Sequence, residues 1–164
     1  MSSFIRTVSF TLLLLLPLTA QASLEAYVSR PDDSYGYELV ESISQNNLNI
    51  DLLKLNSQTW QGIPWWHWLS IIRPAEVKQP DKVLLLIAGG GNSGRKPNLQ
   101  GQEAAVLAMI AQRTGAVCAV LSQTPNQPLF EGRNEDEIIA YTYDKYLNGA
   151  GEDWPLLLPM VKGA

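Results

Sequence analysis

The sequence predicts an α/β protein in which antiparallel strands lead into a parallel sheet with flanking helices. Three observations predict it. Partly alternating, strand-like segments come first, two continuously apolar segments follow, and a helix-forming segment separates those two. Strands that are covered on both faces read as unbroken apolar runs, whereas half-exposed strands alternate. A strand–helix–strand order then requires a right-handed crossover between parallel strands.

The first 22 residues have the pattern of a signal peptide. Arg6 provides a positive charge, the apolar run FTLLLLLPL is too short to span a bilayer, and AQA places small residues before Ser23. No cysteine follows the run, so a lipid anchor is not expected, and an uncleaved apolar anchor is the alternative. We expect a signal peptide over residues 1–22, cleavage before Ser23, no stable membrane insertion, and a secreted or periplasmic location.

Composition narrows the classes of partner and cofactor. The formal net charge is −4, and loss of Arg6 with the leader makes it more negative, so a nucleic-acid partner is not expected. Cys118 lies within the apolar run AVCAVL and is expected to be a buried, unreactive thiol. His67 is the only histidine and has no partner at ligand spacing, so we expect neither a metal nor a cofactor.

The expected antiparallel strands occupy residues 37–43, 48–55 and 65–73. The first two alternate partly and are separated by Asn46-Asn47, which favours a hairpin. The third is aromatic and β-branched, and Pro64 and Pro74 flank it.

The second half of the chain predicts the βαβ unit and two further helices. The apolar strands are expected at residues 82–88 and 116–121, with a helix at 102–113 that Gly115 ends. Asn134 and Glu137 resemble a capping box at the start of a helix that Asn148-Gly149 ends. A last helix is expected near Asp153, with Asp153 as its cap and Pro155 in its first turn.

The stretch VLLLIAGGGNSGRKP, residues 83–97, is compatible with several chemistries. Gly89, Gly91 and Gly94 match a dinucleotide fingerprint, but no helix starts at the glycines and no acid follows the next strand to bind a ribose. A phosphate-binding P-loop is excluded because Arg95 and Lys96 replace its lysine and its hydroxyl residue.

A third interpretation is the glycine loop that follows the third strand of an α/β-hydrolase, where backbone N–H groups face an oxyanion. A tight connection without chemistry is equally compatible with the pattern. Ser93 is not a nucleophile elbow, because Arg95 stands where G-x-S-x-G requires glycine, and His67 comes too early in the chain for the base. No catalytic triad is present, and His67 is expected to be a packing or hydrogen-bonding residue.

Five segments of the chain resemble the PhoPQ-activated pathogenicity-related protein family, also called the autocrine proliferation repressor type. They are SQTWQGIPWWHWLSIIRP, LLLIAGGGN, AVLSQTPNQPLF, EDEIIAYTYDKYL and DWPLLLPMVKGA. The resemblance extends from YVSRPDDSYGYEL to the C-terminus. It implies an α/β-hydrolase fold, with Gly90, Gly91 and Asn92 on the oxyanion-side loop and residues 125–130 facing the same mouth.

The resemblance also implies a longer parent protein, whose nucleophile elbow, acid and histidine come after the equivalent of Lys162. Residues 23–164 would then form a partial α/β-hydrolase-like domain that ends before the elbow. Two functions remain open: a serine-type hydrolase of ester or amide bonds acting on a small molecule or a peptide, or a secreted binding or signalling module without catalysis. In both cases we expect this chain alone to be inactive.

In the strand order that the resemblance implies, the strand at residues 83–87 becomes a sheet edge, because the next strand on that side, which leads into the nucleophile elbow, is not in this chain. It contains no charge, proline or polar residue that would hinder pairing with another chain. Its side chains read as buried on both faces. We therefore expect the chain to self-associate through this strand.

Overall fold

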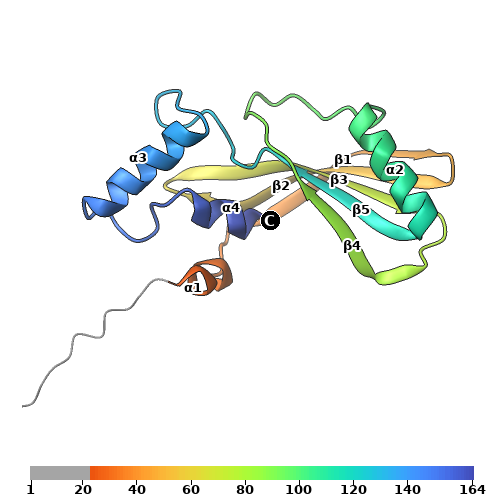
Figure 1. The fold of residues 1–164 in the computed structure, drawn as a ribbon, viewed down its shortest axis with the longest axis horizontal. Coiled ribbons are helices and arrows are strands. Elements are labelled where there is room, and N and C mark those ends of the chain that lie inside the picture. The colour runs from red at the N-terminus through yellow and green to blue at the C-terminus, as the bar shows by residue number, and fades with distance from the viewer. Residues whose placement is uncertain (1–22) are drawn as a thin grey trace, which may run out of the picture.

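A computed structural model describes residues 23–164 and shows one five-stranded sheet with four helices (Figure 1). The strands lie in the order β1-β2-β3-β5-β4. Neighbouring strands are antiparallel except for β4 and β5, which are parallel. This is the predicted arrangement of antiparallel strands leading into a parallel pair, and it confirms the α/β class. The predicted signal peptide lies outside the described residues.

The antiparallel strands are joined by two tight turns. They are β1 (Gly36–Gln45), β2 (Leu48–Trp60) and β3 (Ile63–Pro74). Asn46 and Asn47 have φ values of 51° and 58°, as a two-residue hairpin turn requires. Gln61 and Gly62, at φ 50° and 74°, make the second turn, so β2 runs farther than its alternation predicted.

The parallel pair is a crossover unit. The strand β4 (Gln79–Ile87) leads through a loop to α2 (Gln102–Thr114) and back to β5 (Ala116–Ser122), which pairs with β4 from Val83↔Val117 to Ile87↔Leu121. Gly115 ends α2 at φ 68°, and its N–H donates to the Ala111 carbonyl. The predicted helix, its glycine stop and the parallel pairing are all confirmed.

Two hydrophobic clusters pack against the sheet. Helix α2 contributes Leu107 and Ala111 to the first, which also contains Trp68 and Cys118. The second is built by Tyr27, Trp60 and Trp65 with residues of the C-terminal region. In Figure 1 α2 lies over one end of the sheet, whereas α1 (Leu24–Ser29), α3 (Asp136–Leu147) and α4 (Leu157–Gly163) lie toward the other.

The helix starts differ from the expectations at three places. The short helix α1 was not predicted; Ser23 caps it by accepting the N–H of Ala26 at 3.0 Å. Helix α3 starts after Asn134, at Asp136, although the Glu137 carboxylate accepts the Asn134 N–H at 3.3 Å as in a capping box. Asp153 does not cap α4, because its carboxylate is paired with Arg30 at 2.7 Å instead.

The helix α4 starts at Leu157, so that Pro159 lies in its first turn, where a missing N–H does no harm. The expected start near Pro155 was therefore wrong.

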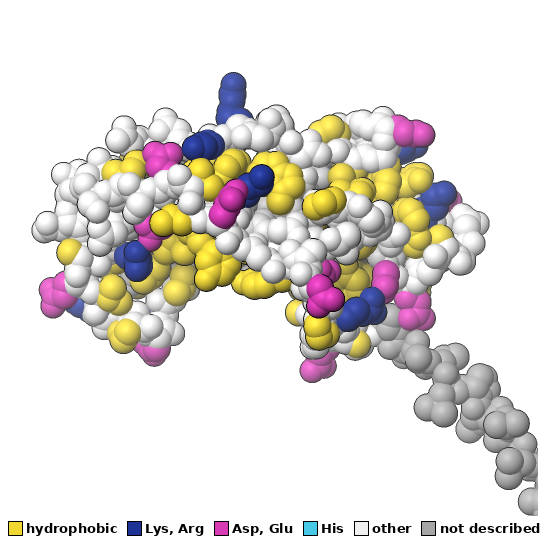
Figure 2. Space-filling view, turned by 180° about the vertical axis from the view of Figure 1, so that it is seen from behind, with side chains coloured by type: hydrophobic (Ala, Val, Ile, Leu, Met, Phe, Trp, Pro, Cys, Tyr) yellow, Lys and Arg dark blue, Asp and Glu magenta, His cyan; other side chains and the backbone are white. Residues whose placement is uncertain are grey.

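Strand β4 is not buried on both faces, and this expectation is corrected. Residues 83–87 are 39–60 % exposed, because α2 packs on β3 and β5 and β4 has no described strand on its outer side. Figure 2 shows hydrophobic side chains gathered on the molecular surface. The exposed run formed by residues 83–87 is called the β4 edge below.

Candidate functional site

Two loops meet at the carboxyl ends of the parallel strands. Because Ile87 of β4 lies opposite Leu121 of β5, the segments that follow these strands leave the sheet at the same edge. The segment after β4 starts with Gly89 and the segment after β5 starts with Gln123. The sheet thus positions the glycine loop beside residues 123–130, called the second loop below, which include the segment 125–130 named from the resemblance.

Hydrogen bonds hold the two loops together. The backbone N–H of Asn92 donates to the Gln127 carbonyl, and its side-chain Nδ2 donates to the Pro128 carbonyl at 2.9 Å. In the other direction, Gln123 Nε2 donates to the Gly91 carbonyl at 2.9 Å. The loop is therefore braced by hydrogen bonds in both directions.

The bracing leaves two donors of the predicted loop unused. In the described part of the chain, the backbone N–H groups of Gly90 and Gly91 have no hydrogen-bond acceptor, whereas the backbone N–H and the side-chain Nδ2 of Asn92 each donate one hydrogen bond. Gly90 has a φ of 142°, a conformation that side chains strongly disfavour. At Gly91 a Cβ would lie 3.3 Å from the Gln127 carbonyl oxygen. Glycine at these positions thus permits the tight turn and the close approach of the second loop.

Two adjacent free N–H groups on a fixed loop are suited to hold an anionic oxygen. Of the three predicted residues, Gly90 and Gly91 are the two whose backbone N–H groups have no acceptor among the described residues. Asn92 positions them by joining the glycine loop to the second loop.

Cavities lie on both sides of the glycine loop. The first, of about 540 Å³, lies between residues 89–104 and the sheet. The smaller cavity, of about 350 Å³, is bounded by the loop after β5 and by the regions of α3 and α4. Glu135 and Asp136 contribute to its wall. Gly89 and Gly90 line both cavities.

The buried pair of Ser57 and His67 resembles a nucleophile with its base but cannot act as one. His67 Nε2 lies 3.0 Å from Ser57 Oγ, and Nδ1 lies 3.3 Å from the Ser122 carbonyl oxygen. His67 is fully buried and Ser57 is 6 % exposed, so no substrate reaches them. Burial lowers the pKa of His67, which keeps the ring neutral. The predicted packing role of His67 is confirmed.

Ser57 had not been linked to His67 in the sequence. The pairing of β2 with β3 shifts between Asn56 and Gln58, so Ser57 occupies a β-bulge. A bulge changes the register by one residue, and alternation alone gives no sign of it.

The structure also describes the surroundings of Cys118 and the loop after Gly94. Cys118 is fully buried, and burial raises the pKa of its thiol. The loop after Gly94 is irregular until α2 starts at Gln102, which is unlike a nucleotide-binding helix that starts at the glycines. Residues 23–164 contain no group of three metal-binding side chains and no helix long and apolar enough to cross a membrane.

The fold and the braced glycine loop define an α/β-hydrolase-like protein. A candidate acetyl xylan esterase from Bacteroides fragilis NCTC 9343 has the same fold at a TM-score of 0.50 and 11% identity, over 85% of this chain and 38% of that one. The sequence model of the PhoPQ-activated pathogenicity-related proteins matches residues 24–164, and the chain belongs to this family.

A curated relative supports the same assignment. Autocrine proliferation repressor protein A of Dictyostelium discoideum is 32% identical over 92% of this chain. The chain spans only 33% of that protein's length. A glucuronoyl esterase from Solibacter usitatus overlaps less well, with a TM-score of 0.39 and 14% identity over 76% of this chain and 45% of that one.

Proposed function

We propose that this chain carries the oxyanion side of a serine-type hydrolase of ester or amide bonds. The observation that supports it is the pair of free N–H groups at Gly90 and Gly91, fixed at the carboxyl end of β4 by bonds from the second loop. When a nucleophile attacks a carbonyl, negative charge develops on its oxygen, and donors that are already in place stabilise that charge without reorganising.

Within residues 23–164 the chain contributes donors but no nucleophile with a usable base. Ser93 has no histidine partner, and the one histidine of the chain is buried against Ser57. Acyl transfer needs a nucleophile and a positioned base. The reaction therefore belongs to a complete family protein, in which the nucleophile, acid and histidine come from other segments.

The test compares this chain with a full-length family member whose glycine loop aligns with residues 89–92. A fluorophosphonate probe and short-chain esters should label and turn over the full-length protein but not this chain. In the full-length protein, replacing the residue aligned with Asn92 by alanine should lower kcat more than it raises KM, because it loosens donors that act in the transition state. Labelling of this chain at Ser93, or an unchanged kcat in the variant, would contradict the proposal.

The second candidate is a secreted binding or signalling module without catalysis. The name of the Dictyostelium relative, a proliferation repressor, favours this class. A full-length member that binds no fluorophosphonate and turns over none of the esters would support it over the hydrolase.

We also propose that the protein is exported and cleaved before Ser23, to a periplasmic or secreted location. The motif AQA before Ser23 supports this. Intact-mass analysis of the exported protein should give a chain that starts at Ser23. Recovery of the unprocessed chain in the cytosol would argue against export.

A further inference from the structure

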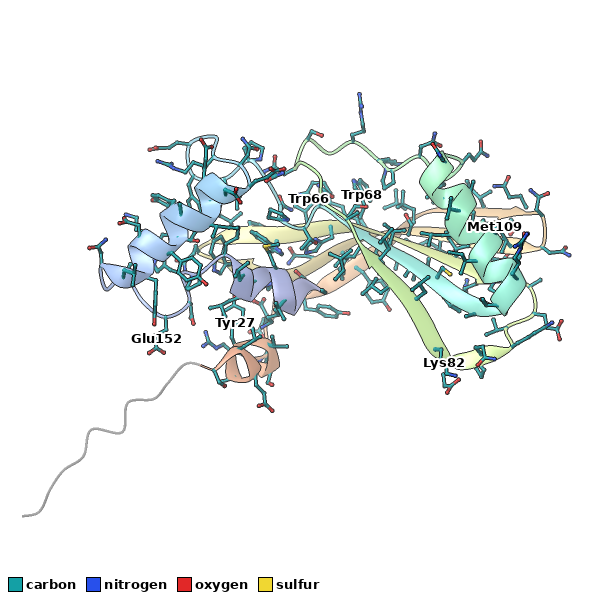
Figure 3. The ribbon with its side chains drawn as sticks, in the orientation of Figure 1. Tyr27, Trp66, Trp68, Lys82, Met109 and Glu152 are labelled. Carbon is teal, nitrogen blue, oxygen red and sulfur yellow. The ribbon has the colours of Figure 1, made fainter. Side chains whose placement is uncertain are left out.

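Gln123 lies where strand β5 leaves the sheet, directly beside the glycine loop. The strand pairs with β4 up to Leu121 and with β3 up to Ser122, and Gln123 is the next residue. In Figure 3 the labelled Trp68 marks this end of β5, because Trp68 is the residue of β3 that pairs with Ser122. The position of Gln123 is therefore set by two neighbouring strands.

The backbone of Gln123 has a conformation that residues with side chains disfavour. Its φ is 66°, in the left-handed region, where glycine and asparagine are the usual residues. The position nevertheless holds a glutamine, and this residue is only 3 % exposed. An unfavourable backbone conformation at a buried residue indicates that its side chain makes a contact with a functional role.

That contact is made with the glycine loop. The backbone N–H of Gln123 donates to the Gly89 carbonyl at 3.2 Å, and the side-chain Nε2 donates to the Gly91 carbonyl at 2.9 Å. Oε1 of the same side chain has no partner among the residues that the structure describes. Gln123 therefore holds the loop at two carbonyls, one on each side of Gly90.

Each of these two bonds fixes a whole peptide group. The Gly89 carbonyl belongs to the peptide that carries the Gly90 N–H, and a trans peptide places these two groups on opposite sides. The Gly90 N–H therefore points away from Gln123, and the bond to the carbonyl of its own peptide strengthens it as a donor. The Gly91 N–H belongs to the next peptide, which lies between the two that Gln123 binds.

The second loop holds one of these peptides from its other end. Gln123 binds the carbonyl of the peptide that joins Gly91 to Asn92, and the N–H of that peptide donates to the Gln127 carbonyl. The second loop is itself anchored to the sheet, because Asn126, 2 % exposed, donates its Nδ2 to a backbone carbonyl of β3. This peptide can therefore turn only if one of its two bonds breaks.

We propose that Gln123 is the positioning residue of the oxyanion donors, because it binds the peptide groups on both sides of the one that carries the Gly91 N–H. It acts through the glycines and does not touch the substrate itself. Its effect on turnover rests on the proposed function, whereas its effect on the loop does not. The test therefore has two arms.

The first arm measures the loop in the full chain, without turnover. Gln123→Met keeps the length of the side chain but removes the N–H, and amide hydrogen exchange is followed by NMR. The Asn92 N–H should exchange about 2- to 10-fold faster in the variant, because its peptide loses one of two bonds. The Ala88 N–H, which donates to the Leu121 carbonyl at 2.8 Å, should exchange at an unchanged rate.

The matched control is Gln112→Met. Gln112 Nε2 also donates to a backbone carbonyl, that of Asn46 at 2.7 Å, but Gln112 lies on α2 beside the turn between β1 and β2. Its replacement should leave exchange of the Asn92 N–H unchanged. Circular dichroism checks folding. If Gln123→Met does not fold, Gln123→Gly takes its place, because glycine suits a φ of 66° and also removes the side-chain bond.

The second arm measures ester hydrolysis by a full-length family member. Methionine at the position aligned with Gln123 should lower kcat about 10- to 100-fold with little change in KM, because the displaced donors act in the transition state. The same replacement at the position aligned with Gln112 should change neither constant.

Three results would overturn the proposal. They are an Asn92 exchange rate that does not respond to Gln123→Met, an equal response in the control, and a kcat that is unchanged or falls only together with a rise in KM. A full-length protein that hydrolyses no ester would instead contradict the proposed function. The exchange rates would then still decide whether Gln123 holds the glycines in place.

Discussion

His67 is held without charge in the centre of the sheet region. Its ring is fully buried, and its two nitrogens face Ser57 Oγ and the Ser122 carbonyl. Burial is the largest influence and lowers the pKa of the ring, although the hydrogen bonds to the backbone oppose it. The folded protein therefore binds fewer protons at this site than the unfolded chain does in mildly acidic solution.

This difference predicts that the free energy of unfolding decreases as the pH is lowered through the mildly acidic range. Since the pKa of His67 is lowered on folding, its contribution is fully present above the unfolded value of about 6.5 and declines below it, by at most about 1.4 kcal/mol per pH unit. Urea unfolding between pH 5.5 and 7.5 should show this decline. His67→Gln should be less stable at pH 7.5 but should show a flatter dependence. Equal pH slopes in the two proteins would assign the effect to other groups.

At the scale of single residues, the sequence predicted the place of a residue in the fold better than the partners of its hydrogen bonds. It placed His67 in a packing role and Gly90, Gly91 and Asn92 on one loop. It could not show that the backbone N–H and the side-chain Nδ2 of Asn92 both donate to the second loop. Those bonds depend on how two segments 35 or more positions apart in the chain approach each other. The contact of Ser57 with His67 was hidden for a similar reason, since a bulge sets it.

At the scale of elements, local signals were most reliable where a turn residue and a hydrophobic pattern agreed. The glycine end of α2 is such a case, because Gly115 has a left-handed φ of 68° directly before β5. The start of α4 is the opposite case. Asp153 has the chemistry of a helix cap, but an ion pair with Arg30, which is distant in sequence, holds it elsewhere.

Gly115→Ala should destabilise the protein more than a left-handed glycine alone explains. A Cβ at this position would lie 2.6 Å from the side chain of Lys78, whereas at Gly149, φ 81°, it would meet nothing within 4 Å. Gly149→Ala should therefore cost only the backbone term of about 1–2 kcal/mol, and Gly115→Ala should cost more. Thermal melts of the two variants measure the difference. Equal losses would mean that Lys78 moves aside freely.

At the scale of the whole molecule, the β4 edge is a continuous exposed apolar run along one side of the sheet. Its five residues are 39–60 % exposed and the strand is paired only with β5. The sequence predicted that this strand would form an edge, but its unbroken apolar pattern suggested burial. Such a pattern records that a strand is suited to be covered on both faces, and it cannot show whether the covering elements are present.

We propose that the chain self-associates through the β4 edge, because unpaired backbone groups and apolar side chains are presented together there. Size-exclusion chromatography with light scattering should show oligomers whose fraction rises with concentration. Leu85→Lys should reduce that fraction. Val106→Lys is the matched control, since Val106 is 47 % exposed but lies on α2. A monomer at all concentrations, or an equal effect of the control, would contradict the proposal.

The sheet edge brings two loops together and their hydrogen bonds fix the glycines. We propose that the free N–H of Gly91 stabilises an oxyanion in the complete protein. The most direct measurement replaces the amide N–H by an ester oxygen at the position aligned with Gly91 in a full-length family member, with the position aligned with Gly94 as control. The Gly91 replacement should lower kcat for ester hydrolysis by about 10²- to 10³-fold while KM changes little, and the Gly94 replacement should have little effect. A kcat that does not respond to loss of the Gly91 N–H would contradict the account.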